Sequence, residues 1–580
     1  MGSTPNQSYT LSFLALGLFL LVAFLYVFGL GQTGLFDVRE AQTVTISMGA
    51  PTLQDAFIAP PSNTAPHTNP APFIHGLQYM AMSFFGETTF AMRLPSALAA
   101  FLMVFVFYNS VMVLTQARRY ALIAAATLAL SPSVVLAARL ATPDALFALV
   151  TMSAAFMFIG NIYQRERSYM RLFVVGLLLG GGFLVGGVWA FILPFFVAFL
   201  VALLKSHRVY NVASIAPFSV LVAGYIALMP WMAAVLTQKK PEELLDLLYS
   251  LSRLAQFDVA LGGSQPWWFF PVLVLLLTVP WSFFLLPGVV ANLKTLLQKL
   301  DHPEPREALP ALALVWLILG GGALIVADYV TGISWQQYFL MGGLWLSAPT
   351  ALLVADYLDR LPQKSMGALW FAFIFVLSLS VAAVLLWLPQ LPDVFSGHET
   401  YAGLSPLLEN IGLSMPAFSD FWQGVLAVKT DWGLAPVVLS GLFMVSLVMG
   451  SYMMRHGALE GVLFTFVGMW FVMFLAIQGL AVPVYDHLQQ PLKWMSVKIK
   501  GEHQDTPAKV TLYGMHRPSV AYLSGVSPRQ VHWAGNAFQS TTLPLFVLTN
   551  ANHMPDIAPH VPAGASKECF GGYCLIEVYR

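Results

Sequence analysis

The feature that most constrains this chain is the recurrence of apolar stretches that are about as long as a bilayer is thick. A helix needs roughly 20 mostly apolar residues to cross the hydrocarbon core, and the sequence holds about 13 such stretches. Charged residues make up only 10% of the chain and hydrophobic residues 58%, whereas a soluble domain is about a quarter charged. We therefore expect an all-α polytopic membrane protein. The expected spans are 10–30, 92–114, 120–138, 143–162, 171–186, 188–204, 213–236, 267–292, 308–327, 338–356, 366–389, 433–453 and 459–482.

Basic residues in the short loops predict how the chain sits in the membrane. Alternate loops carry most of the Lys and Arg, among them Arg118, Arg119, Lys205, Arg306 and Arg360. Loops rich in these residues stay in the cytoplasm, so the N-terminus is expected inside and the C-terminus outside. The sequence favours a bacterial plasma (inner) membrane, with the tail in the periplasm.

The longer connections fall on the expected outer side, at 31–91, 237–266, 390–432 and the tail from 483. Binding and catalytic residues concentrate in loops, so the functional face is expected there. The apolar stretch 73–86 is too short to span and is expected to lie along the interface or under the bundle.

The tail predicts a separate extracytoplasmic domain, residues 483–580, after a membrane domain of residues 1–482. Three β-like runs, 509–513, 543–549 and 574–579, are separated by turn-rich segments, which predicts a small α/β fold. Cys569 and Cys574 are the only cysteines, and outside the cytoplasm a local disulfide is favoured over two free thiols.

The charge balance and the cysteine spacing argue against two classes of partner. The chain has 28 basic and 28 acidic residues, without the basic excess of a nucleic-acid-binding protein. No Cys pair or Cys/His cluster with metal-ligand spacing is present, so neither a metal nor another cofactor is expected.

Ionisable residues at the edge of the membrane are candidates for chemistry. Asp37-Val38-Arg39-Glu40 follows the first expected span. Asp37 or Glu40 could act as general base on an acceptor, and Arg39 could bind a phosphate. The alternative is a helix start capped by Asp37, with Glu40 three residues later.

A second candidate is the segment between the third and fourth spans. It contains Arg139 and Asp144, and Asp144 would face the same outer cavity as Asp37. The structural alternative is a helix start with Thr142 as cap, Pro143 in the first turn and Asp144 favouring the helix dipole.

Two further groups of polar residues fall on the outer side. His67, Asn69 and His75 could contact a substrate, although such histidines are more often structural groups. Lys239, Lys240 and Arg253 could neutralise a lipid phosphate or, alternatively, anchor the chain to headgroups.

Several motifs together resemble the family-39 glycosyltransferases of the GT-C superfold. They are Arg93-Leu94-Pro95-Ser96, Leu130-Ser131-Pro132, Arg139-Leu140-Ala141-Thr142-Pro143-Asp144, Trp267-Trp268-Phe269-Phe270-Pro271 and Val279-Pro280-Trp281-Ser282. That family includes lipid A aminoarabinose transferases and protein O-mannosyltransferases. The resemblance covers residues 10–290 and implies 13 helices with an external C-terminal domain.

The resemblance also implies an activity. A sugar on a polyprenyl phosphate would enter from the lipid, and an acid of the first outer loop would deprotonate an envelope acceptor (a lipid, a glycan or a protein). Attack on the anomeric carbon would invert it and release the lipid phosphate beside bound cations.

The sequence departs from the family at five polar positions. Arg39 aligns with the Asp of an Asp-Glu pair, and Asn69-Pro70-Ala71-Pro72 replaces a motif with Glu and Lys. A Lys is missing near Gly186, a His is missing at 262–265, and Gln336-Gln337 replace a basic residue. These departures favour an alternative function, a catalytically inactive relative that binds a lipid-linked glycan or acts as a scaffold.

Overall fold

The computed structural model describes most of the chain. The described residues are 5–36, 39–58, 72–164, 168–205, 208–238, 244, 245, 248, 275, 278–294, 296–300, 302–331, 335–364, 367–387, 432–456, 460–505, 509–515, 517–531, 533–539, 544–550, 553–570 and 573–579.

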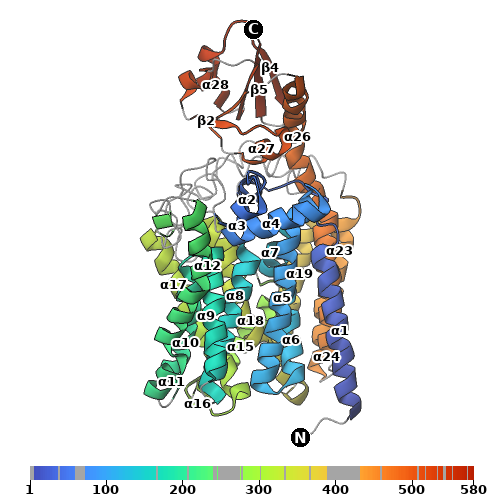
Figure 1. The fold of residues 1–580 in the computed structure, drawn as a ribbon. Helices are drawn as coiled ribbons and strands as arrows, with labels where there is room; N and C mark the ends of the chain where they lie inside the picture. The colour runs from blue at the N-terminus through green and yellow to red at the C-terminus, as the bar shows by residue number, and fades with distance from the viewer. Residues whose placement is uncertain are drawn as a thin grey trace.

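The molecule is a long helical bundle with a small β-containing domain at one end (Figure 1). The N-terminus lies at the opposite end of the bundle from that domain. The bundle helices are α1 (Pro5–Val27), α5 (Thr89–Thr115), α6 (Arg118–Ala129), α7 (Pro132–Arg139), α8 (Asp144–Gln164), α9 (Tyr169–Gly186), α10 (Trp189–Leu204), α11 (Arg208–Ile215), α12 (Pro217–Gln238), α15 (Ser282–Leu293), α16 (Leu296–Leu300), α17 (Pro305–Thr331), α18 (Trp335–Lys364), α19 (Ala368–Trp387), α23 (Ala435–Met444), α24 (Gly450–Arg455) and α25 (Glu460–Leu475).

Among the residues that the structure describes, nine helices are long and apolar enough to cross a bilayer. The helices α6 and α7 make a tenth if they form one span, which bends by 59° between them. The polytopic helical fold is therefore confirmed. The helices α10 and α18 coincide with two of the three other predicted spans, and α15 with the second half of the third; α10 and α15 are short, so the count of 13 stays a prediction.

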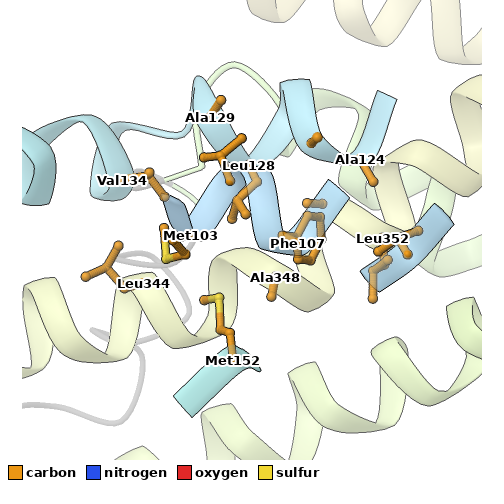
Figure 2. Packing of buried hydrophobic residues seen from close by; sticks show 14 of the residues in the cluster. Met103, Phe107, Ala124, Leu128, Ala129, Val134, Met152, Leu344, Ala348 and Leu352 are labelled. Carbon is orange, nitrogen blue, oxygen red and sulfur yellow. The ribbon is translucent and has the colours of Figure 1, made fainter. Parts of the chain in front are cut away.

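The core of the bundle is built from small and medium-sized apolar side chains on five neighbouring helices. Figure 2 shows Met103 and Phe107 of α5 in one cluster with Leu128 of α6, Val134 of α7, Met152 of α8 and Leu352 of α18. Alanines at many buried positions allow the helices to approach closely, as is typical where lipid gives no hydrophobic drive for association. This packing fixes the helix ends that carry the candidate site.

The connection between α1 and α5 folds into three short helices on the outer end of the bundle, below the C-terminal domain (Figure 1). They are α2 (Arg39–Met48), α3 (Leu53–Ile58) and α4 (Pro72–Phe85). The helix α4 coincides with the apolar stretch that is too short to span. Leu35, Ala41 and Val44 pack with Met82 of α4 and Met92 of α5, so α2 is held against the bundle by its apolar side.

The chain leaves the last span through a continuous helical segment. A π-helical turn, η2 (Ala476–Ala481), joins α25 to α26 (Val482–Asp505), which reaches into the C-terminal domain (Figure 1). A similar turn, η1 (Val445–Met449), joins α23 to α24.

The C-terminal domain is a mixed five-stranded sheet in the order β2-β1-β3-β5-β4. Its central strand β3 is parallel to β1 and antiparallel to β5, and α26 covers one face through Leu492, Met495 and Ile499. The predicted strand-containing domain is confirmed. Its elements are β1 (Lys509–Tyr513), α27 (Ser519–Ser524), β2 (Arg529–Val531), η3 (Ala534–Asn536), β3 (Leu545–Asn550), α28 (Met554–Ile557), η5 (Ala558–His560), β4 (Ser566–Phe570) and β5 (Tyr573–Val578).

A disulfide joins the edge strand β4 to its neighbour. Cys569 and Cys574 face each other in the β4–β5 register, and their sulfurs are 2.04 Å apart. Because β4 is largely exposed and has a neighbour on one side only, this bond holds an edge strand that few buried contacts stabilise.

Replacing both cysteines by serine is expected to destabilise the C-terminal domain by about 2 kcal/mol, since the loop that the bond closes is short. Denaturant unfolding followed by the fluorescence of a tryptophan in this domain measures the change. Adding a reductant to the wild type should reproduce the loss and should leave the double serine variant unchanged. Equal stability with and without reductant would contradict the prediction.

Candidate functional site

The candidate site forms at the outer end of the bundle, where the turn between α7 and α8 meets α2, α4 and α5. Three side chains fasten this turn. Glu40 Oε1 accepts the Ala141 N–H at 2.8 Å, and Gln78 Nε2 donates to the Ala141 carbonyl at 3.1 Å. Ser96 Oγ donates to the Thr142 carbonyl at 2.9 Å. The start of α8, with Asp144, is therefore fixed relative to α2.

Glu40 forms a buried ion pair with Arg93 of α5. Arg93 Nε lies 2.7 Å from Glu40 Oε1, and Arg93 Nη2 lies 3.0 Å from Oε2. The side chains are 2% and 1% exposed. A bidentate pair of this kind compensates for the desolvation of both charges only when the remaining hydrogen-bonding positions are also filled.

Glu40 meets that condition. Besides the two bonds from Arg93, its carboxylate accepts the N–H groups of Phe36 at 2.7 Å and of Ala141 at 2.8 Å. These four bonds fill the roughly four lone-pair positions of a carboxylate. The bond from Phe36 runs back across the start of α2, as in a capping box. The geometry suits Glu40 to holding three chain segments together.

Two arginines fasten the exit from α1. Arg93 also donates to the carbonyls of Leu30, Thr33 and Gly34 and to Thr33 Oγ1. The guanidinium of Arg139, at the end of α7, donates to the carbonyls of Leu25, Phe28 and Gly29 at 2.8–3.1 Å. A helix leaves its last carbonyls unsatisfied, and Arg139 satisfies one of them, that of Leu25. The other bonds hold the segment 28–34 that follows α1, so Arg93 and Arg139 together orient this segment.

A second buried polar network lies next to the ion pair. His75 Nδ1 of α4 is 2.8 Å from Ser47 Oγ of α2, which donates to Gln78 Oε1 at 2.5 Å. All three residues are at most 3% exposed. Through Gln78 this network reaches the Ala141 carbonyl, so the two networks meet at one residue, where Glu40 accepts the N–H of Ala141 and Gln78 donates to its carbonyl. Burial lowers the pKa of His75 to about 4, although a hydrogen bond with the Thr43 backbone opposes the shift, and His75 is neutral near pH 7.

We expect the free energy of unfolding to fall as the pH is lowered from about 6.5 to 4. The folded-state pKa of His75 lies below its unfolded value, so the unfolded chain takes up the proton first. The stabilisation is present above pH 6.5 and is lost as the pH falls through this interval, by about 3 kcal/mol for a shift of this size. Unfolding of the protein in lipid nanodiscs, followed from pH 7.5 to 4, measures it. A His75→Gln variant should lose most of this slope, and an unchanged slope would contradict the prediction.

The predicted site residues divide into three groups. Glu40, His75, Arg139 and Asp144 come together at this end of the bundle. Arg39 begins α2. The others, Asp37, His67, Asn69, Lys239, Lys240 and Arg253, lie outside the described residues.

Asp144 is 2% exposed and opens the first turn of α8. The cap expected from Thr142 is not formed, because the Thr142 hydroxyl has no hydrogen-bond partner among the described residues. Pro143 precedes the helix instead, and its carbonyl accepts the Phe147 N–H at 2.9 Å.

Sequence reasoning missed Arg93, Ser47 and Gln78 as members of the site. The sequence could have indicated Arg93 as a site residue, because it is a cation at the start of an apolar span and belongs to the Arg-Leu-Pro-Ser motif. Nothing in the sequence indicated Ser47 or Gln78, since single polar residues in short helices are common. In the described part of the chain, no group of three or more His, Cys, Asp or Glu residues could hold a metal ion.

The C-terminal domain lies directly against the site. Gln489 of α26 donates to the Leu35 carbonyl, and Tyr522 of α27 packs against the apolar side of α2. A small cavity of about 30 Å³ remains between Gln42 and Thr45 of α2 and the start of α27. The helix α2 is thus enclosed by the bundle on one side and by the C-terminal domain on the other.

Comparison with known proteins places this geometry in a structural class. Residues 69–234 match the family described as dolichyl-phosphate-mannose-protein mannosyltransferase. No curated protein matches the chain in sequence. Two crystal structures of ArnT from Cupriavidus metallidurans, one bound to undecaprenyl phosphate and one in the apo state, are similar over nearly all of their length.

The undecaprenyl phosphate complex superposes with a TM-score of 0.70 at 16% identity, covering 97% of each chain. The apo structure gives 0.69 at 16% identity and covers 99% of this chain and 98% of that one. The expected fold is confirmed: the chain is a multi-pass membrane protein with the GT-C glycosyltransferase fold.

Proposed function

We propose that this protein transfers a sugar from a polyprenyl-phosphate donor to a lipid, glycan or protein acceptor at the outer face of a bacterial plasma membrane. The observation that carries the proposal is the similarity to ArnT along nearly the whole chain, from the first span to the C-terminal domain. ArnT has been crystallised with undecaprenyl phosphate, and the matching family is described by a dolichyl-phosphate-mannose donor.

The proposed reaction begins with removal of a proton from the acceptor nucleophile. Its oxygen or nitrogen then forms a bond to the anomeric carbon, the bond from that carbon to the phosphate oxygen breaks, and the lipid phosphate leaves with inversion at carbon. Among the three candidate carboxylates, Glu40 has its acceptor positions filled by Arg93 and two backbone N–H groups. We therefore assign the base to Asp37, with Glu40 and Asp144 positioning the loop that carries it.

Nearby cations would stabilise the negative charge of the leaving phosphate. Arg39 follows Asp37 by two residues, and the candidates Lys239, Lys240 and Arg253 belong to another outer loop. Arg139 donates to three carbonyls of the α1 exit, so a role on the phosphate would require it to release some of them. In this proposal His67, Asn69 and His75 shape the acceptor side, and no metal takes part.

The proposed orientation places the N-terminus in the cytoplasm and the C-terminal domain in the periplasm. The disulfide between Cys569 and Cys574 supports it, because such bonds persist in oxidising compartments.

The second candidate function is an inactive relative that binds a lipid-linked glycan. The five polar departures from the family pattern, with Arg39 at the place of an acid, favour it.

One experiment separates the two functions. The protein in lipid nanodiscs is mixed with a panel of polyprenyl-phosphate sugars and an extract of membrane acceptors, and released polyprenyl phosphate is measured together with donor binding. Release that needs an acceptor supports the transferase. Binding without release supports the inactive relative, and neither binding nor release would contradict both.

A further inference from the structure

A cavity of about 200 Å³ lies between α1, α6 and α25, and it extends toward the end of the bundle opposite the candidate site. Its walls are apolar, and they include Leu14 and Leu21 of α1, Ile123 of α6, Leu130 directly after α6, and Phe466 of α25. The single charged residue among its lining residues is Arg119, at the start of α6. Since α1 and α25 are both candidate spans, the cavity lies within the hydrocarbon layer and is suited to a hydrocarbon chain.

The depth of the cavity corresponds to one leaflet. On α1 it runs from Leu11 to Leu21, ten residues that rise about 15 Å at 1.5 Å per residue. The hydrocarbon core is about 30 Å thick, so one leaflet accounts for about 15 Å. The cavity therefore begins at the end of the bundle where the N-terminus lies and reaches the middle of the membrane.

Trp470 lines the cavity and belongs to an aromatic group at its mid-membrane end. Trp470 Nε1 donates to the Leu21 carbonyl at 2.9 Å, and its ring stacks on Phe474 with centroids 5.5 Å apart. Phe24 packs against both rings. A cavity as deep as one leaflet matches the length of an acyl chain, which favours an acyl chain as the occupant.

At its other end the cavity adjoins a cluster of ion pairs that includes Arg119. Arg119 pairs with Asp359, and Asp359 also pairs with Arg306. These residues belong to a cluster with four cations (Arg119, Lys299, Arg306, Arg360) and three carboxylates (Glu307, Asp356, Asp359), which leaves one positive charge in excess. A phosphate at this level would be attracted by Arg119 and by the net positive charge of this cluster.

We propose that this cavity is a binding site for one acyl chain of an anionic phospholipid, with the phosphate of that lipid beside Arg119. The lipid belongs to the leaflet on the N-terminal side, and it fills the space between α1 and the rest of the bundle. This site is independent of the proposed transferase reaction, because it lies at the opposite end of the spans.

Gly17 provides a sharp test, because a Cβ added there meets no atom within 4 Å. Gly17→Leu should extend into the cavity without a clash and should lower lipid retention by about tenfold or more, since the leucine takes the volume that the chain would fill. Gly441→Leu on α23 is the matched control, because its Cβ also meets nothing within 4 Å. Val467→Trp on α25 should act like Gly17→Leu from the opposite wall.

The measurement is native mass spectrometry of the full chain after incubation with phosphatidylglycerol or with phosphatidylcholine of the same acyl chains. We expect one retained phosphatidylglycerol in the wild type and in the Gly441 control, and weaker retention of phosphatidylcholine. Arg119→Gln should remove this preference for the anionic lipid. Equal retention by Gly17→Leu, Val467→Trp and the control would overturn the site. Equal retention of both lipids would overturn the anionic headgroup, and a retained polyprenyl phosphate that Gly17→Leu displaces would overturn the acyl chain.

Discussion

Arg93→Met is expected to lower the free energy of unfolding by about 3–5 kcal/mol, the usual cost of removing one partner of a buried ion pair. The substitution leaves the Glu40 carboxylate buried without its cation, and it removes the donors that satisfy the carbonyls of Leu30, Thr33 and Gly34. Unfolding of the reconstituted protein in mixed micelles with increasing fractions of sodium dodecyl sulfate measures this loss.

Two variants make the result specific. Arg455→Met removes an exposed cation from the end of α24, where its guanidinium lies 5.5 Å from the centre of the Phe371 ring, and it should change stability by no more than about 1 kcal/mol. The double variant Glu40→Gln with Arg93→Met should be more stable than Arg93→Met alone, because no uncompensated charge remains. A loss for Arg93→Met no larger than that of the Arg455 control would show that the ion pair does not hold the outer loop.

Asp37→Asn is expected to lower the rate of sugar transfer by about 10²–10⁴-fold without changing the stability of the protein. This range is typical when a general base is removed, and the amide cannot accept the acceptor's proton. The measurement is the initial rate of polyprenyl phosphate release under saturating donor, alongside the unfolding curve of each variant.

Asp55→Asn is the control from the same outer loop. Asp55 Oδ2 accepts the Thr52 hydroxyl at 2.6 Å at the start of α3, so its carboxylate has a local partner and its loss should leave transfer near the wild-type rate. Glu40→Gln should lose stability and activity together, which distinguishes a positioning residue from a base. If Asp37→Asn retains full activity while Glu40→Gln loses activity without a loss of stability, the assignment of the base is reversed.

Hydropathy predicted the spans well because every helix that crosses lipid needs a long apolar stretch. The third predicted span shows that hydropathy does not reveal a bend within such a stretch. Residues 120–138 read as one apolar stretch, yet the chain bends by 59° between α6 and α7. Leu130-Ser131-Pro132 marks the place, since Pro132 cannot continue the hydrogen bonding of α6 and begins α7 instead.

The buried pairing at the site could not be predicted in the same way. Glu40 and Arg93 are separated by 53 residues along the chain, and no local pattern indicates that they meet. The sequence did indicate both members separately, one as an acid beside a span and the other within a motif. The partnership depends on how α2 folds back onto α5, which follows from tertiary packing.

The helix α26 has a consequence for how the chain can be divided. Residue 483, the boundary suggested by hydropathy, falls inside a helical segment that continues from the last span. Beyond it, Gln489 bonds to Leu35 and Thr45 bonds to Pro518 at 3.5 Å. A shortened protein that ended near residue 482 would therefore lose the outer cover of α2 as well as the sheet. The C-terminal region is part of the architecture of the first outer loop, and deleting it would alter the surroundings of Leu35 and of α2, near the opposite end of the sequence.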